Sequence, residues 1–265
     1  MSTKISMKNK LSVHLVQPDI IWQQPEQNRL HYEHLLNSIN DTDVLILPEM
    51  FSTGFSMQPE GLAETHPGES LAQMQVWAVE KKALVIGSIM TRVQSVYYNR
   101  LYLVKPDGTF DYYDKRHLFR MGNEHEHYAA GTDRVITHWR GWRICPLVCY
   151  DLRFPVWSRN RNDYDLLLYV ANWPESRNKV WKTLLEARAL ENQAYCIGVN
   201  RVGIDGNDLS YSGDSRCISH RGDILAAATP HKEEIVNVTL HKDELEAFRE
   251  KFPAYLDGDK FHIDL

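Results

Sequence analysis

The sequence predicts an α/β fold, on the basis of three observations. Short apolar runs recur along the chain, helical patterns lie between several of them, and hairpin signals interrupt the alternation. Alternating strands and helices are typical of this class. The 265 residues contain no internal repeat, low-complexity tract or Gly/Ser linker. We therefore expect one domain over residues 11–265, after a flexible polar segment at residues 1–10.

Six segments are expected to be the main strands. The first alternates apolar and polar residues, and the other five are continuous apolar runs of the kind found in buried strands. In chain order they are residues 11–17, 43–47, 83–89, 144–148, 165–171 and 194–200.

Helices and hairpins complete the expected arrangement. Apolar or aromatic residues at helical spacing predict a helix at 25–39. Pro67-Gly68 before residue 69 and the lysines at the end predict a helix at 69–82, and the content of Leu, Ala, Glu and Arg predicts one at 180–192. A polar helix at 242–251 follows a last strand at 235–240. Turn residues at 105–108 predict a hairpin between 97–104 and 109–113. The turn at 221–223 predicts a second hairpin, between 212–219 and 224–228.

Composition and charge exclude several kinds of partner. The chain is 43% hydrophobic and 25% charged, with a net charge of -5, so neither a nucleic acid nor an anionic membrane surface is expected to bind. No apolar run approaches the roughly 20 residues of a membrane span. The first ten residues lack the apolar stretch of a signal peptide. A cytoplasmic location is expected.

The four cysteines differ in their surroundings, and none belongs to a C-x-x-C pair. Cys145, Cys196 and Cys217 lie in apolar runs and are expected to be buried, inert thiols. Cys149 ends an apolar run, and the sequence then becomes polar at Tyr150-Asp151-Leu152-Arg153. Its sulfur is therefore expected at the mouth of a pocket, as a nucleophile, rather than in the core.

A carboxylate and an amine stand at two other strand ends. Glu49 follows an apolar run and precedes an aromatic, apolar stretch, where a carboxylate holds a proton more readily than in water and suits a general base. Lys115 ends the first hairpin and could stabilise an oxyanion. The alternative for Glu49 is a solvated loop residue, and the alternative for Lys115 is a surface charge cluster.

Other functional motifs are absent or incomplete. His117, His125 and His127 fit no common zinc spacing, so no metal site is expected. The sequence has no G-x-S-x-G elbow, no phosphate-binding P-loop and no G-x-G-x-x-G dinucleotide fingerprint. Residues 205–208 lack the glycine and glutamate of a calcium loop and are expected to form a turn.

Taken together, three motifs resemble those of the nitrilase superfamily of carbon–nitrogen hydrolases. They are Leu47-Pro48-Glu49-Met50-Phe51, Asp114-Lys115-Arg116-His117-Leu118-Phe119 and Cys149-Tyr150-Asp151-Leu152-Arg153-Phe154-Pro155. The resemblance implies an αββα sandwich that pairs as αββα-αββα in a homodimer, and it implies no cofactor. It also implies that Glu49 is the general base, Lys115 the oxyanion cation and Cys149 the nucleophile.

The resemblance extends to further residues of the site. The family's second glutamate, seven residues before a glycine, corresponds to Glu124 before Gly131, with Glu126 as the rival. The backbone N–H of Tyr150 would share the oxyanion with Lys115. Four side chains are expected to contact the substrate: Phe51, Phe119, Trp173 and Arg177. The charged, histidine-rich loop from 119 to 131 departs from the family pattern, so the pocket edge there is expected to differ.

Within the superfamily, the chain is most similar to bacterial omega-amidases. His117-Leu118-Phe119-Arg120-Met121 and Asn172-Trp173-Pro174 carry this likeness. The implied reaction is hydrolysis of the terminal amide of 2-oxoglutaramate or 2-oxosuccinamate through a cysteine thioester. Three alternatives stay open: another carbon–nitrogen hydrolase (aliphatic amidase, carbamoylase or nitrilase), a non-catalytic scaffold on the same fold, and a redox sensor that pairs Cys149 with Cys145.

Overall fold

Two β-sheets of matching strand arrangement form the centre of the molecule. The computed structural model describes residues 8–264. The first sheet has seven strands in the order β15-β1-β2-β4-β5-β6, with the short β3 paired to β4. Its strands are β1 (Lys10–Gln17), β2 (Val44–Ile46), β3 (Glu64–Thr65), β4 (Leu84–Val93), β5 (Val96–Val104), β6 (Phe110–Asp114) and β15 (Glu234–His241).

The second sheet has six strands in the order β14-β13-β10-β9-β8-β7. They are β7 (Thr137–Trp139), β8 (Trp142–Val148), β9 (Leu166–Val170), β10 (Tyr195–Val199), β13 (Arg216–Ile218) and β14 (Ile224–Ala227). Each sheet contains three adjacent parallel strands, β1-β2-β4 in one and β8-β9-β10 in the other, and the short β3 also runs parallel to β4. Each set of three is flanked by one antiparallel strand on one side and by two on the other.

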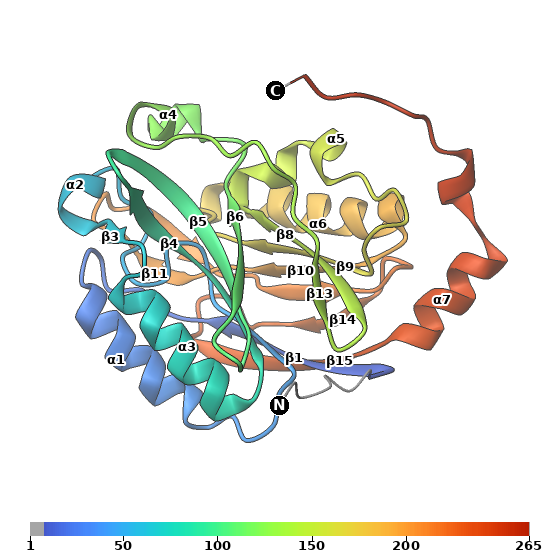
Figure 1. The fold of residues 1–265 in the computed structure, drawn as a ribbon, viewed down its shortest axis with the longest axis horizontal. Coiled ribbons are helices and arrows are strands. Elements are labelled where there is room, and N and C mark those ends of the chain that lie inside the picture. Colours follow the sequence, from blue (N-terminus) through green and yellow to red (C-terminus); the bar gives the residue numbers. More distant parts are fainter. Residues whose placement is uncertain (1–7, 265) are drawn as a thin grey trace.

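Helices cover the outer faces of the two sheets, as Figure 1 shows. The helices α1 (Pro25–Leu36) and α3 (Glu69–Lys81) lie on one side, and α5 (Pro155–Ser158) and α6 (Asn178–Asn192) lie on the other. The remaining elements are α2 (Pro59–Leu62), η1 (Arg120–Gly122), α4 (Glu124–His127), η2 (Cys149–Arg153), η3 (Glu175–Arg177), β11 (Val202–Ile204), β12 (Ser210–Ser212), α7 (Lys242–Lys251) and η4 (Ala254–Asp257).

Alternation along the strands of the first sheet separates two hydrophobic cores. Val44 and Ile46 of β2 belong to a core shared with residues of the second sheet, whereas Leu45 and Leu47 belong to a core shared with α1 and α3. Successive side chains of a strand point to opposite faces, so a strand buried on both faces is continuously apolar. This arrangement explains the apolar runs of the sequence and confirms the predicted αββα layers.

The predicted strands and helices are confirmed, with shifts at their ends and one error. The first helix ends at Leu36 rather than residue 39. The segment 212–219, expected as one strand, is broken because Gly213 and Asp214 both have positive φ, 75° and 61°. Ser210–Ser212 instead pairs with β11, and Arg216–Ile218 pairs with β10 and β14.

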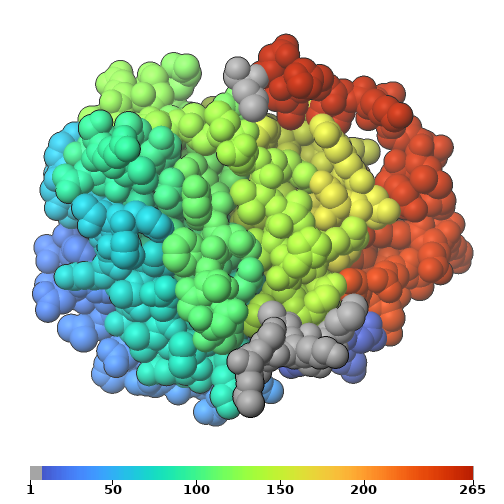
Figure 2. All heavy atoms as spheres, viewed as in Figure 1, coloured from blue at the N-terminus to red at the C-terminus, as the bar shows by residue number. Residues whose placement is uncertain are grey.

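Lys8 and Asp264, the first and last described residues, are both exposed. Most of the predicted flexible segment, residues 1–7, lies outside the described residues, whereas Lys10 already begins β1. The C-terminal residues, red in Figure 2, cover one side of the molecule, where Arg161 stacks on the Phe261 ring at 4.6 Å. No helix among residues 8–264 is long and apolar enough to cross a membrane.

A buried carboxylate fastens α7 to the second sheet. Asp165, which is 1% exposed, accepts hydrogen bonds from Arg143 Nη2 at 2.6 Å and Arg249 Nη1 at 3.1 Å. Burial alone would raise the pKa of this carboxyl, but the Arg143 hydrogen bond and charge, with Lys242, hold it below 3.8. Asp165 therefore contributes stability that is present above pH 3.8 and is lost as the pH falls through the lower folded-state value.

We expect Asp165→Asn to lower the free energy of unfolding at pH 7 by roughly 3–5 kcal/mol, because both arginines lose their charged partner. Urea denaturation at pH 7 and in the acid range measures this. The difference between wild type and variant should shrink as the pH falls below 3.8. An equal difference at every pH would contradict the assignment.

Candidate active site

Three predicted residues meet at the ends of strands from both sheets. Glu49 follows β2, Lys115 follows β6 and Cys149 follows β8. The Lys115 ammonium donates to Glu49 Oε1 at 2.9 Å. It also lies 2.9 Å from each oxygen of Glu124. All three of these ion-paired side chains are fully buried, so the charges are strongly coupled.

Glu124 also anchors the loop that forms one edge of the site. Its Oε2 accepts the Phe119 N–H at 2.6 Å, whereas the rival Glu126 is exposed. The loop then returns against Lys115, whose carbonyl accepts the Gly131 N–H at 2.9 Å. A Cβ at Gly131 would stand 2.1 Å from the Asp114 carbonyl oxygen. Glycine is therefore required there, which gives a physical reason for the glutamate–glycine spacing.

Two asparagines complete the buried hydrogen bonds of Glu49. Asn99 Nδ2 donates to Glu49 Oε1 at 2.7 Å and to Glu124 Oε1 at 3.3 Å. The Asn172 N–H donates to Glu49 Oε2 at 2.8 Å. Asn172 belongs to a motif noted in the sequence, but Asn99 lies within an expected strand and carried no signal of its own.

The charges of the site change the proton affinity of its members. Burial would lower the pKa of Lys115, but Glu124 and Glu49 more than offset this and raise it far above 10.5. Burial and the charge of Glu49 raise the pKa of Glu124, against the opposing effect of Lys115. Burial and Glu49 raise the pKa of Cys149 well above 9, again against Lys115. At neutral pH the sulfur is a thiol that needs a base.

Cys149 stands at a tight turn between β8 and η2. Its φ is +43°, a left-handed conformation that non-glycine residues adopt mainly where the surroundings hold them. The residue is half-buried, and its Sγ lies 3.8 Å from the Asn172 carbonyl oxygen. Tyr150 is the second residue of η2, and the first N–H groups of a helix have no partner within that helix. Its N–H is therefore a candidate donor to an oxyanion.

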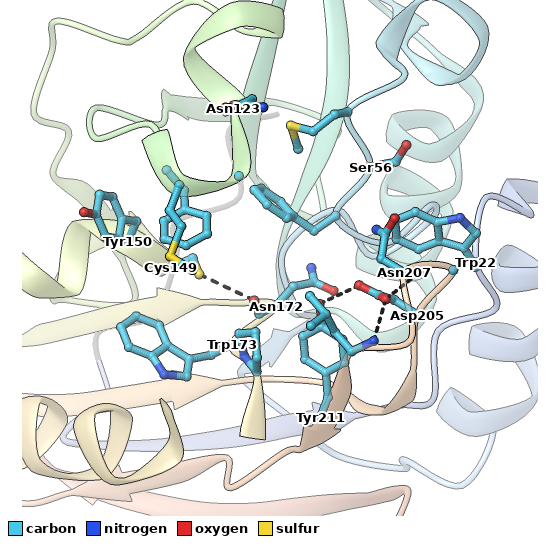
Figure 3. Close-up of a pocket in the computed structure, with 18 of the residues that line it drawn as sticks. Trp22, Ser56, Asn123, Cys149, Tyr150, Asn172, Trp173, Asp205, Asn207 and Tyr211 are labelled. Atoms are coloured by element: carbon cyan, nitrogen blue, oxygen red, sulfur yellow. Dashed lines mark hydrogen bonds between the residues drawn. The ribbon is translucent and has the colours of Figure 1, made fainter. Parts of the chain in front are cut away.

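A pocket of about 520 Å³ opens above Cys149 and Lys115. Figure 3 shows Cys149, Tyr150 and Trp173 at one end and Trp22, Asp205 and Asn207 at the other. Of the four side chains predicted to contact substrate, three line the pocket: Phe119, Trp173 and Arg177. The Arg177 guanidinium lies over the Phe119 ring at 5.3 Å.

The prediction for Phe51 is wrong. Its ring is fully buried and packs against Tyr32 and Trp77, at centroid distances of 5.4 and 6.2 Å, in the core beneath α1 and α3. The preceding Met50 has φ +43°. The backbone turns at this residue, so the side chains of Glu49 and Phe51 point in different directions. Phe55, not Phe51, lines the pocket, with its ring 5.0 Å from the Lys115 ammonium.

Several pocket residues were not found from the sequence. Arg153 lines the pocket, and its guanidinium lies 5.1 Å from the Trp173 ring. Asp205 forms the predicted turn, accepting the Asn207 N–H at 2.8 Å, and it also accepts the Tyr211 hydroxyl at 2.9 Å. Among residues 8–264, no group of three or more His, Cys, Asp or Glu side chains is placed to hold a metal ion.

This arrangement suits attack by a thiol on a carbonyl carbon, with proton transfer to a carboxylate and charge stabilisation by an ammonium. The class it defines is that of cysteine hydrolases that act through a thioester. The chain belongs to the carbon-nitrogen hydrolase family, whose model matches residues 12–250. The predicted family and fold are thereby confirmed.

Two curated relatives extend over nearly the whole chain. Omega-amidase YafV of Escherichia coli (strain K12) is 50% identical over 259 residues, covering 96% of this chain and 98% of the relative. A 2-oxoglutaramate amidase of Bacillus subtilis (strain 168) is 32% identical over 255 residues, covering 94% and 97%. The predicted resemblance to bacterial omega-amidases agrees with both.

A solved structure agrees as well. A CN-hydrolase superfamily protein of Xanthomonas campestris, described with an arsenic adduct in its active site, superposes with a TM-score of 0.94. It is 45% identical to this chain, and the match covers 96% of this chain and 99% of that one.

Proposed function

We propose that the protein is an omega-amidase that hydrolyses the terminal amide of small 2-oxo acid amides, such as 2-oxoglutaramate and 2-oxosuccinamate, to the 2-oxo dicarboxylate and ammonia. The 50% identity to an omega-amidase over nearly the full length carries this proposal. The buried Glu49, Lys115 and Cys149 beside the pocket support it, because a scaffold without catalysis has no need of three coupled ionisable groups.

In the first half of the reaction, Glu49 takes the Cys149 proton as the sulfur attacks the amide carbon. The raised pKa of the thiol makes this base necessary. The Lys115 ammonium and the Tyr150 N–H stabilise the oxyanion, and each such donor is worth roughly 3 kcal/mol of barrier. Collapse of the tetrahedral intermediate breaks the C–N bond, and Glu49 protonates the departing ammonia, leaving a thioester.

In the second half, water attacks the thioester carbon and releases the acid and the Cys149 thiol. Glu49 or Glu124 activates this water. Both carboxylates already accept hydrogen bonds, Glu49 from Lys115, Asn99 and Asn172 and Glu124 from Lys115, Asn99 and Phe119. Glu124 also holds Lys115 and the pocket loop. No metal or organic cofactor enters the scheme.

The substrate carboxylate needs a cationic partner, and two arginines of the pocket wall are available. Arg153 and Arg177 both line the pocket and are partly exposed, and their guanidinium groups lie over the rings of Trp173 and Phe119. We expect Arg153→Gln or Arg177→Gln to raise KM for 2-oxoglutaramate by roughly 10- to 100-fold, the value of a charge-assisted hydrogen bond. Activity on a neutral amide should change little. An unchanged KM in both variants would show that another group binds the substrate carboxylate.

The deciding experiment is ammonia release from 2-oxoglutaramate, beside glutamine, a simple aliphatic amide, a ureido compound and a nitrile. Selective release from 2-oxoglutaramate supports an omega-amidase. Release from another substrate alone would favour an aliphatic amidase, carbamoylase or nitrilase, and release from none would favour the scaffold. The homodimer and the cytoplasmic location stay predictions, the latter supported by four free cysteines.

A further inference from the structure

Asp151, two residues after the nucleophile, is fully buried and has no part in the chemistry described above. Its carboxylate lies within hydrogen-bond distance of four donor groups. Oδ2 accepts the Val148 N–H at 3.0 Å and the Tyr113 hydroxyl at 2.8 Å. Oδ1 accepts the His117 N–H at 2.9 Å and lies 2.7 Å from His117 Nδ1. The two oxygens of a carboxylate offer enough acceptor sites for all four groups.

These donors come from both sides of the reacting atoms. Val148 immediately precedes Cys149, whereas Tyr113 and His117 stand two residues on either side of Lys115. Asp151 therefore joins the turn that carries the nucleophile to the segment that carries the oxyanion cation. The two segments belong to different sheets, and no backbone strand pairing joins β6 to β8.

The groups around Asp151 are themselves fixed by further contacts. The Tyr113 hydroxyl, which donates to Asp151, accepts Trp157 Nε1–H at 3.0 Å and the Arg116 N–H at 3.1 Å. The His117 ring stacks on Phe154, with centroids 3.8 Å apart and planes 4° apart. Because the groups around Asp151 have these further hydrogen-bond and stacking partners, the network is held in one arrangement rather than several.

We propose that Asp151 is a positioning residue, which sets the place of the Lys115 ammonium relative to the Cys149 sulfur. It contacts neither substrate nor the reacting atoms and acts through the backbone on either side of them. The role requires a carboxylate. An asparagine of the same shape would turn an NH₂ group toward at least one of the four donors. This inference rests on the thiol chemistry of the proposed function, but not on the identity of the amide.

Asp151→Asn tests the proposal, with Asp165→Asn as the matched control. Asp165 is an equally buried carboxylate at the opposite end of the second sheet, bound to arginines instead of catalytic segments. We expect Asp151→Asn to lower kcat by about 100-fold, the effect of a misplacement of about 1 Å, with KM nearly unchanged. Asp165→Asn should lower stability but leave kcat unchanged.

Alkylation of Cys149 by iodoacetamide gives a readout that needs no amide substrate. With Lys115 displaced, the thiolate loses part of its stabilisation, so Asp151→Asn should be alkylated more slowly than wild type and Asp165→Asn at the wild-type rate. Wild-type alkylation and kcat in folded Asp151→Asn would overturn the proposal. If only the substrate assignment is wrong, the alkylation difference will persist.

Should Asp151→Asn fail to fold, Tyr113→Phe offers a milder change. It removes the hydrogen bond to Asp151 and the two that the hydroxyl accepts from Trp157 Nε1 and the Arg116 N–H, and it leaves the carboxylate and its other donors in place. The proposal predicts lower kcat at unchanged KM together with slower alkylation. Loss of thermal stability without either effect would overturn it.

Discussion

Replacing Cys149 by alanine is expected to abolish amide hydrolysis while leaving the protein folded. Without a nucleophile no thioester forms, and the loss should approach the roughly 10⁶-fold effect of removing a nucleophile from a serine hydrolase. Alanine tolerates the φ of +43° at this turn as well as cysteine does, so the melting temperature should change little. Ammonia release and thermal unfolding measure the two effects.

Cys145→Ala is the matched control for that variant. Cys145 is fully buried four residues earlier, and burial raises the pKa of its thiol to about 12. Its replacement should retain turnover at a small cost in stability. Full activity in Cys149→Ala would refute the thioester scheme. Loss of oxidant sensitivity in both single variants would instead favour the redox-sensor alternative.

Replacing Lys115 by glutamine is expected to damage both activity and stability. The change removes a donor from the oxyanion, worth about 10²–10³-fold in kcat. It also leaves Glu49 and Glu124 buried without their shared cation, at a cost of roughly 3–5 kcal/mol in the free energy of unfolding. Steady-state kinetics and urea denaturation would measure both.

A surface lysine gives the comparison for Lys115. Lys105 pairs with Asp111 at 3.1 Å, and both side chains are partly exposed. Surface pairs of this kind contribute about 0–1 kcal/mol, so Lys105→Gln should be close to wild type in both assays. A kcat for Lys115→Gln within roughly tenfold of wild type would exclude Lys115 from oxyanion stabilisation.

The sequence was most informative where strands end. Buried strands are recognised by their apolar runs, and a polar residue that follows such a run stands out. Glu49 and Cys149 were found for this reason, whereas Lys115 was found at the end of a hairpin, and the family resemblance gave all three their roles. Two errors arose from backbone direction, which residue type does not reveal: left-handed φ at Met50 turns Phe51 away from the pocket, and left-handed φ at Gly213 and Asp214 interrupts a strand.

The roles of residues that act through partners far away in the sequence could not be predicted from the sequence. Asn99 is one polar residue inside a strand, and the two glutamates it contacts lie 50 and 25 positions away. Asp151 is next to the nucleophile, but its importance comes from donors 34 and 38 positions earlier. The pairing of strands within the first sheet brings Asn99 to Glu49, whereas the packing of the two sheets brings Asp151 to Tyr113 and His117.

The repeated strand arrangement has a consequence for how the enzyme matures. Glu49 and Lys115 come from the first sheet, whereas Cys149 and Asn172 come from the second, so neither half of the chain contains a working centre. During synthesis the nascent chain cannot hydrolyse an amide until its later half has emerged and docked. The first turnover thus marks completed assembly of the two sheets.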